Sequence, residues 1–396
     1  MLVSLFILAK NNVFIAFISY VLTITLANLL GPEIFGKYSL ILVIASILSL
    51  LINFGTNKTA PVTASEKGIN FVLRETLTIR FIMLAFCIFC LAIYSIYNQD
   101  TAFYIFCLLF TGVNLGFYFE ISSKNIIYSY VYLFERTMYI TSIFFVIYFS
   151  TPSLDIIFTF FLLTTLVSLG FQYHSADFKV KNIFITNFQT IGNIFIKHTP
   201  LVVIALSTLA FGGFSRIILE DGLGLEKMGI YSAGWQLVTI GTIFQSQVTR
   251  VWRLKMSTAI TSNNKSLLMT LIKSYFIFAT VPFVFLVTFL FISSDQVVDF
   301  LFTSEYSELA NVLPTLSIYY IVINLAGLVD VLWVAVDKNK LYMYINILFG
   351  LLLLVFLSLI SDNASLIDFA ISTIIVHMAM VLVLAIIWYR NFLPSS

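Results

Sequence analysis

The sequence predicts an all-α polytopic membrane protein with about twelve transmembrane helices in two six-helix lobes. The 396-residue chain is 60% apolar and only 10% charged, against about 25% charged residues in an average soluble domain. Its mean hydropathy is +1.02, and apolar stretches of about 20 residues, the length that crosses a bilayer, recur along it. This composition excludes a soluble fold, a disordered chain, a secreted disulfide scaffold and a nucleic-acid-binding protein.

Twelve stretches have the length and apolarity of a membrane span. The first is interpreted as a retained span and not as a signal peptide, because no small-residue cleavage site follows it. Six spans fall in each predicted lobe, residues 1–185 and 186–396. The predicted spans are 13–30, 39–56, 79–97, 102–119, 132–150, 155–173, 198–218, 229–248, 268–293, 309–335, 341–360 and 367–389.

Basic residues are divided unevenly between the two sides of these spans. Eighteen of the 21 lysines and arginines fall on one side. Because basic residues gather in cytoplasmic connections, this predicts that both termini are cytoplasmic. The longest predicted connections lie on the same side, so no large outer loop is expected to carry a catalytic domain. These connections are 57–78, 174–197 and 249–267.

Three cysteines lie in apolar stretches: Cys87, Cys90 and Cys107. Cys87 and Cys90 form a C-x-x-C pair, which could indicate a redox or zinc site. A metal site would need two further ligands at the same membrane depth, so thiols embedded in lipid or in the helix bundle are favoured. We expect no metal and no cofactor.

One internal repeat is clear, the pattern G-x-E-x-x-G-x-Y-S at an offset close to half the chain. Both copies fall in an outer connection between an odd-numbered span and the next. Six spans per half is an even number, so the two halves share one orientation, as in transporters with parallel repeats. The glycines suit a tight helix-to-helix turn, and a structural role for the motif is favoured. The repeated positions are Gly31, Glu33, Gly36 and Tyr38, and Gly224, Glu226, Gly229 and Tyr231.

Three stretches carry a family resemblance: 26–65, 198–256 and 302–316. They resemble polysaccharide repeat-unit flippases of the Wzx type, in the superfamily that includes MATE exporters and lipid II flippases. Two positions depart from the family's usual pattern. Ser215 precedes Arg216 where the family often has Asp, and Ser304 stands where it often has Gly. The predicted span count argues against the lipid II branch.

The resemblance implies a two-lobed transporter, without enzyme activity, that works by alternating access. The implied cargo is an oligosaccharide on undecaprenyl pyrophosphate, used for O-antigen or capsular polysaccharide in the bacterial inner membrane. Membrane lipid is an implied partner, and a polysaccharide polymerase and a chain-length regulator are candidates. Two alternatives stay open: a MATE-like cation-coupled drug exporter, which would favour an acidic cavity, and a polytopic O-antigen polymerase or glycosyltransferase.

A pyrophosphate headgroup favours a cationic groove, and arginine clamps phosphate in two hydrogen bonds. Arg216 is the only arginine assigned to the outer half, and an isolated arginine in hydrocarbon costs at least about 2.5–3.5 kcal/mol. Glu220 and Asp221 are possible partners for it. Lys58 and Arg250 occupy nearly equivalent repeat positions. The candidates for a cationic groove are Arg216, Lys58, Arg250 and Lys197.

Three ionisable residues inside or beside spans are candidates for ion coupling: Glu135, Asp330 and His377. Glu135 and Arg136 are neighbours on a helix and do not face each other, so each needs another partner. A histidine can titrate near neutral pH, but a packing role for His377 is favoured.

Overall fold

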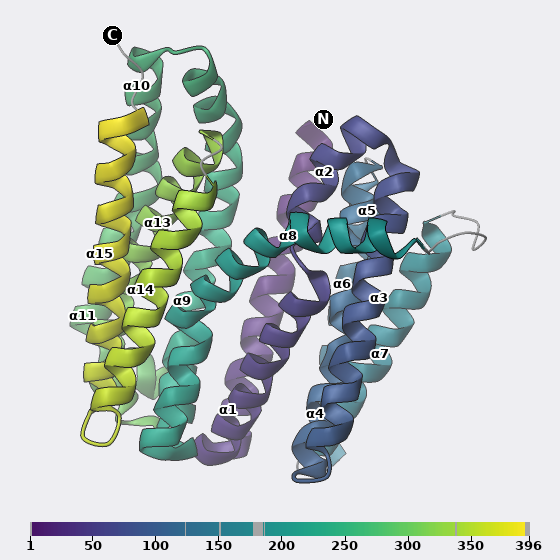
Figure 1. Cartoon of the computed structure of the whole chain (residues 1–396). Coiled ribbons are helices and arrows are strands. Elements are labelled where there is room, and N and C mark those ends of the chain that lie inside the picture. Colours follow the sequence, from purple (N-terminus) through teal and green to yellow (C-terminus); the bar gives the residue numbers. More distant parts are fainter. Residues whose placement is uncertain are drawn as a thin grey trace. The chain divides into compact units, whose positions relative to one another are not determined.

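Every regular element of the described residues is a helix in this computed structural model (Figure 1). The structure describes residues 2–122, 124–149, 152–176, 185, 187–336 and 339–392. Ten of its helical stretches are long and apolar enough to cross a membrane. The chain is therefore a multi-pass membrane protein of the predicted all-α class.

Two of these ten stretches each contain two spans. Val13–Asn53 has 41 residues and Gln189–Thr239 has 51, about twice the length a bilayer needs. Inside them, Gly31 (φ 71°) and Gly224 (φ 85°) leave the helical conformation. Figure 1 shows the two arms of α1 meeting at such a turn. Counted by arms, the described helices agree with the predicted twelve spans.

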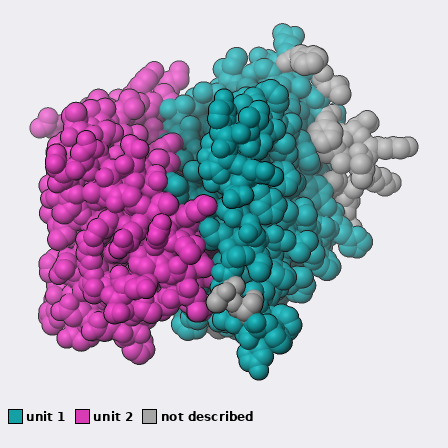
Figure 2. Space-filling view, turned by 90° about the horizontal axis from the view of Figure 1, so that it is seen from below, with its two compact units in different colours: residues 1–22, 40–206 teal, residues 23–39, 207–396 magenta. Residues whose placement is uncertain are grey.

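The chain divides into two compact units (Figure 2). Unit 1 comprises residues 1–22 and 40–206, and unit 2 comprises residues 23–39 and 207–396. The arm of α1 around Gly31 therefore packs with the second half of the chain. The predicted lobes 1–185 and 186–396 stay a prediction, and their boundary lies among residues of which only residue 185 is described.

Unit 1 is built from these helices: most of α1 (Leu2–Asn53), α2 (Thr56–Lys67), α3 (Ile69–Tyr94), α4 (Gln99–Leu109), η1 (Phe110–Val113), α5 (Gly116–Ile121), α6 (Asn125–Phe149), α7 (Leu154–Ser175) and the first part of α8 (Phe188–Leu209). Caps fix two of its helix starts. The Asn98 side chain accepts a hydrogen bond from the Thr101 amide (3.1 Å), and Ser153 accepts one from the Ile156 amide (3.4 Å), so an orphan amide at each helix start is satisfied.

Unit 2 is built from residues 23–39 of α1, the last residues of α8 and these helices: η2 (Ala210–Phe214), α9 (Ser215–Thr261), α10 (Lys265–Tyr275), η3 (Phe276–Thr280), α11 (Val281–Leu301), η4 (Ser304–Tyr306), α12 (Leu309–Ser317), α13 (Tyr319–Ala335), α14 (Asn339–Ile360) and α15 (Leu366–Phe392). The segments η2 and η3 are π-helical. A π-turn opens the regular hydrogen-bond ladder and is frequent at functional sites.

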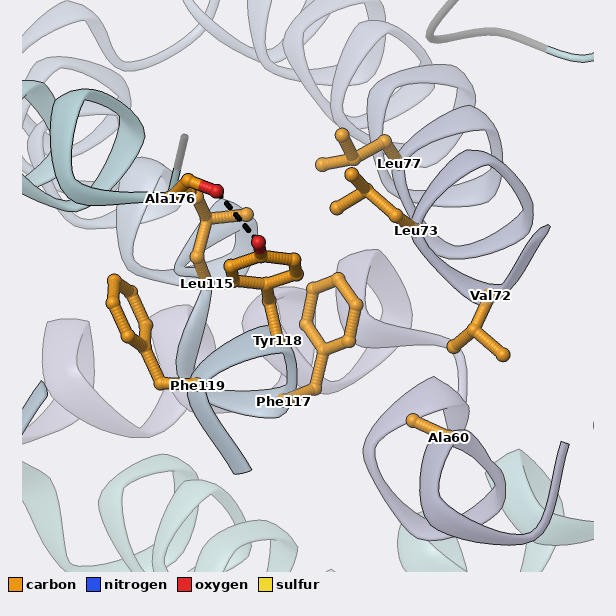
Figure 3. Packing of buried hydrophobic residues seen from close by; sticks show 9 residues of the cluster. All are labelled: Ala60, Val72, Leu73, Leu77, Leu115, Phe117, Tyr118, Phe119 and Ala176. Atoms are coloured by element: carbon orange, nitrogen blue, oxygen red, sulfur yellow. Dashed lines mark hydrogen bonds between the residues drawn. The ribbon is translucent and has the colours of Figure 1, made fainter. Parts of the chain in front are cut away.

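The structure contradicts the prediction that 57–78 and 249–267 are loops. Helix α2 and the first turns of α3 occupy the former, and α9 continues to Thr261 through most of the latter. The end of the third predicted loop, 174–197, is also helical, because α8 begins at Phe188. These segments are polar enough to look like loops, yet they are helical because tertiary packing covers one side. In α2, Ala60 is buried in a cluster with Val72, Leu77, Phe117 and Phe119 (Figure 3).

The same cluster fixes α5 and the end of α7. The Tyr118 hydroxyl donates to the Ala176 carbonyl oxygen over 2.6 Å (Figure 3). The amide of Leu115, at the start of α5, donates to Gln172 Oε1 of α7 over 2.8 Å. The irregular backbone between η1 and α5 is thus held rigidly against α7, beside the polar cavity of unit 1.

Candidate functional site

A polar cavity of about 240 Å³ lies inside unit 1, between the end of α1, the η1–α5 connection, α6 and α7. Nine of its ten lining residues carry a polar side-chain group, which is unusual in a membrane protein interior, where polar residues are scarce and commonly functional. The lining residues are Ser49, Thr111, Asn114, Tyr128, Tyr132, Glu135, Arg136, Thr165, Leu169 and Gln172.

Glu135 and Arg136 both line this cavity from α6. Glu135 is 8% exposed. The Arg136 guanidinium lies 5.1 Å from the centre of the Tyr132 ring and 5.6 Å from that of Phe161, and its Nε donates to the Tyr132 hydroxyl over 3.2 Å. No ion pair joins Glu135 to a described basic side chain. The cavity therefore holds one carboxylate and one guanidinium that are not directly paired.

Arg80 of α3 is fully buried next to this cavity. Its Nη2 donates to Asn57 Oδ1 over 2.5 Å, its Nη1 donates to the Asn114 carbonyl oxygen, and its guanidinium lies 4.6 Å from the centre of the Phe117 ring. Thr56 Oγ1 accepts further hydrogen bonds from it at 3.2 Å. All of these partners are neutral, so Arg80 contributes an unneutralised positive charge.

A second buried polar cluster joins α2, α3 and α8 within unit 1. His198 Nε2 lies 3.0 Å from Glu75 Oε1, and its Nδ1 lies 3.3 Å from Thr59 Oγ1. His198 is 1% and Glu75 4% exposed. Lys197 Nζ donates to Thr63 Oγ1 over 3.2 Å and lies 3.9 Å from the same Glu75 oxygen. Here the buried carboxylate is compensated by neighbours.

Arg216 lies in unit 2, directly after the π-helical segment η2. Its Nε donates to the Gly212 carbonyl oxygen of that segment over 2.5 Å, and its guanidinium lies 5.8 Å from the centre of the Trp235 ring. It forms no ion pair with Glu220, Asp221 or another described acidic residue. A carbonyl oxygen of the π-helical segment thus accepts a hydrogen bond from this side chain.

Aromatic rings connect Arg216 to His377. Trp235 packs on Tyr319 with ring centres 4.9 Å apart, and the Tyr319 hydroxyl lies 2.6 Å from His377 Nδ1. His377 also stacks on Phe211 with ring centres 4.2 Å apart. Two residues predicted for different roles thus belong to one buried network of unit 2.

Asp330 lies outside that network. It is half-buried on α13 and accepts a hydrogen bond from the Tyr342 hydroxyl of α14 over 3.2 Å. The sequence-predicted candidates for ion coupling are therefore not gathered at one site: Glu135 lies in unit 1, and His377 and Asp330 lie at two places in unit 2.

The two copies of the repeat motif meet each other inside unit 2. A Cβ on Gly36 would lie 2.8 Å from the Leu225 carbonyl carbon, and one on Gly229 would lie 2.7 Å from the Pro32 carbonyl carbon. The arms of α1 and α9 therefore cross in backbone contact, as small residues permit between membrane helices. Tyr38 and Tyr231 are buried, whereas Glu33 and Glu226 are exposed.

Lys58 and Arg250 lie in α2 and α9, but their side chains are outside the described part of the structure. Sequence reasoning missed Arg80, Glu75 and His198 as interior residues. The sequence did hold one indication that Arg80 and Glu75 are interior residues, because both lie close to the predicted start of span 3. Within the described residues, no group of His, Cys, Asp and Glu could hold a metal ion.

Comparisons with known proteins place this arrangement in a structural class. An inward-facing multidrug resistance MATE family transporter of the MOP superfamily aligns with a TM-score of 0.78 at 14% identity, covering 97% of this chain and 98% of that one. An outward-facing one aligns with a TM-score of 0.65 at 15% identity, covering 98% and 95%. The chain therefore has the fold of MATE and other MOP superfamily transporters.

One curated protein is similar in sequence, the capsular polysaccharide biosynthesis protein CapF of Staphylococcus aureus. It is 23% identical over 254 residues, which cover 62% of this chain and 63% of CapF. The match thus spans less than two thirds of that relative. No family model matches the chain. A MOP superfamily transporter from Pyrococcus furiosus, whose structure was described as having a binding pocket of reverse polarity, aligns with a TM-score of 0.65 at 13% identity, covering 99% and 96%.

Proposed function

We propose that this protein flips oligosaccharide repeat units, linked to undecaprenyl pyrophosphate, across the cytoplasmic (inner) membrane for O-antigen or capsular polysaccharide synthesis. The transporter fold supports movement of a substrate across the membrane without covalent chemistry. The similarity to a capsular polysaccharide biosynthesis protein supports the class of cargo. The uneven distribution of basic residues supports cytoplasmic termini.

The sign of the buried charge carries this proposal. Arg80 and Arg216 lie inside membrane-spanning helices, and neither forms an ion pair with a described carboxylate. Arginine remains protonated in proteins. The spans therefore present uncompensated positive charge, which suits a polyanionic headgroup and disfavours the cationic drugs that an acidic cavity would bind.

The headgroup of such a cargo is too polar to cross hydrocarbon without a hydrated path, whereas its polyprenyl tail can stay in lipid. Guanidinium groups bind phosphate oxygens in two parallel hydrogen bonds. Arg216, Lys58, Arg250 and Lys197 are the proposed cationic groove, and the cargo crosses by alternating access. Glu135, Asp330 and His377 are proposed as proton sites that couple to this cycle.

Deletion of the gene, followed by separate quantification of lipid-linked repeat units in the two leaflets, tests the proposal. We expect repeat units to accumulate in the cytoplasmic leaflet. Complementation with Arg216→Ala, Lys58→Ala or Arg250→Ala should lower surface polysaccharide. Arg390→Ala is the matched control, because Arg390 is exposed in the last turn of α15 and should support full output.

Normal appearance of repeat units in the outer leaflet of the deletion strain would overturn the flippase proposal. Full polysaccharide output from all three groove variants would overturn the cationic groove alone.

A drug exporter is the second candidate, because the aligned structures include multidrug resistance MATE transporters. It predicts that the deletion strain becomes more sensitive to cationic drugs while its surface polysaccharide is unchanged. The proposed flippase predicts the opposite pair of results.

A further inference from the structure

The cavity of unit 1 contains polar groups that no described residue satisfies. Thr165 of α7 is 3% exposed and lines the cavity, and its hydroxyl has no hydrogen-bond partner. Beyond the bond from its Nε to Tyr132, the Arg136 guanidinium donates to no described acceptor. Buried polar groups are almost always hydrogen-bonded in native proteins, and exceptions call for an explanation. Unmet donors and acceptors around one cavity indicate a polar occupant.

The charges of the cavity restrict what that occupant can be. Among the lining residues, Glu135 supplies a carboxylate and Arg136 a guanidinium, so the lining is neutral in sum. Arg80 lies behind the lining, and its guanidinium already donates to Thr56, Asn57 and Asn114. A metal cation would be repelled by the guanidinium and a phosphate by the carboxylate, since like charges in a low dielectric interact strongly. A neutral ligand whose groups both donate and accept hydrogen bonds would satisfy both side chains at once.

The remaining walls suit a ligand with polar edges and apolar faces. Tyr128 and Tyr132 lie with ring centres 6.2 Å apart and planes inclined by 9°, and both line the cavity. Asn114 and Thr165 add an amide and a hydroxyl. The volume of about 240 Å³ is just below the roughly 300–1,000 Å³ of sites for drug-sized ligands, so one small ring fits better than a larger molecule.

We propose that this cavity is a binding site for a single neutral sugar residue. Each sugar hydroxyl can donate to Glu135 and accept from Arg136 or Thr165, while the flat C–H faces of the ring lie against Tyr128 or Tyr132. The inference rests on the proposed function in naming a sugar of the transported oligosaccharide as the natural occupant. The site itself depends only on the chemistry of its walls.

Saturation-transfer NMR on the full-length protein in nanodiscs tests this directly. The nanodiscs must lack glycolipids and glycoside detergents, which would compete for the site. The probes are the methyl glycosides of glucose, galactose, N-acetylglucosamine and rhamnose. We expect saturation transfer to at least one of them, competed by the same sugar without its methyl group.

Three isosteric variants separate a binding role from a structural one. Glu135→Gln should weaken sugar affinity about tenfold or more, and Thr165→Val about fivefold, because each removes a group aimed at the ligand. Tyr148→Phe is the matched control on α6, since Tyr148 is 83% exposed. The affinity of this variant for the sugar should equal that of the wild type. Thr165→Val removes an unpartnered hydroxyl, so it keeps the test valid if Glu135→Gln fails to fold.

No transfer to any of the four sugars would overturn the proposal. So would unchanged affinity in Thr165→Val and Glu135→Gln, or a Na⁺-induced thermal shift that requires Glu135 without sugar binding, which would assign the cavity to a cation. The two proposals fail separately. Sugar binding with normal outer-leaflet repeat units in the deletion strain refutes the flippase, and flipping without sugar binding refutes this site.

Discussion

Substitution of Gly229 or Gly36 by alanine should destabilise unit 2, because the two arms that carry the repeat motif cross in backbone contact. A Cβ on Gly229 would lie 2.7 Å from the Pro32 carbonyl carbon and 3.0 Å from the Gly36 nitrogen, and closer still to the Pro32 oxygen. These obstacles are backbone atoms, which no side-chain rotation can remove. The helices would have to move apart.

The expected magnitude follows from these distances. Favourable carbon contacts lie at about 3.5–4.0 Å, so the Pro32 carbon alone requires the crossing to open by about 1 Å, and the nearer Pro32 oxygen requires more. Overpacking of this kind lowers the free energy of unfolding by about 1–3 kcal/mol. The upper end of that range, about 3 kcal/mol, applies here because the backbone must shift. The better helix propensity of alanine returns about 1 kcal/mol, which leaves a net loss of about 2 kcal/mol. For a unit of roughly 200 residues this lowers Tm by about 4–8 °C.

The assay is the fraction of full-length protein that stays monodisperse in size-exclusion chromatography after heating. Gly170→Ala is the matched control, because Gly170 lies within α7 and a Cβ there meets nothing within 4 Å. The control should melt at the same or a slightly higher temperature than the wild type. If Gly229→Ala and Gly170→Ala melt together, the close crossing is refuted as a source of stability.

Three further changes have expected outcomes in the same heating assay. Thr165→Val should leave the free energy of unfolding unchanged or raise it by up to about 1–3 kcal/mol, because it removes a buried hydroxyl without a partner. A clearly lower free energy of unfolding would contradict the absence of a partner. His198→Leu should lower the free energy of unfolding by about 3 kcal/mol, because it leaves the buried Glu75 carboxylate without its nearest partner. Adding Glu75→Gln should recover part of that loss. Additive losses in the double variant would argue against an interaction between the two side chains. Gly224→Ala should lower the free energy of unfolding by about 1–3 kcal/mol through its backbone alone, because its φ of 85° and ψ of 172° lie in a region that glycine adopts almost exclusively, while a Cβ there has open space. Unchanged stability would show that the turn adapts.

Local sequence patterns predicted the local structure well. The helical class and the membrane spans follow from apolar stretches of spanning length. Of the four motif glycines expected in a turn, Gly31 and Gly224 have a positive φ, which glycine takes at little cost, whereas Gly36 and Gly229 lie in the helical arms that cross. The predicted loops at 57–78 and 249–267 failed for the opposite reason. Their helices depend on distant partners, such as the cluster around Ala60, which no local window contains.

The candidate site was only partly predictable. Glu135 was identified because a carboxylate in an apolar stretch is conspicuous, yet its cavity is built by residues from α1, η1, α6 and α7. Arg80 is one of the eighteen basic residues that the sequence assigns to the cytoplasmic side, and the structure shows it fully buried. Where helices are apolar on most sides, the sequence pattern does not say which face turns inward, because lipid and protein interiors accept the same side chains.

The sequence by itself thus determined the class of protein, its spans and the glycine turns, since each depends on the hydropathy or conformational freedom of a few neighbouring residues. Tertiary structure alone decided which scarce polar groups meet. Glu75 and His198 are 123 positions apart, and Gly36 and Gly229 touch across half the chain. Such pairs arise from helix packing, in which the need to satisfy buried polar groups and the room left by small residues select partners that sequence distance does not encode.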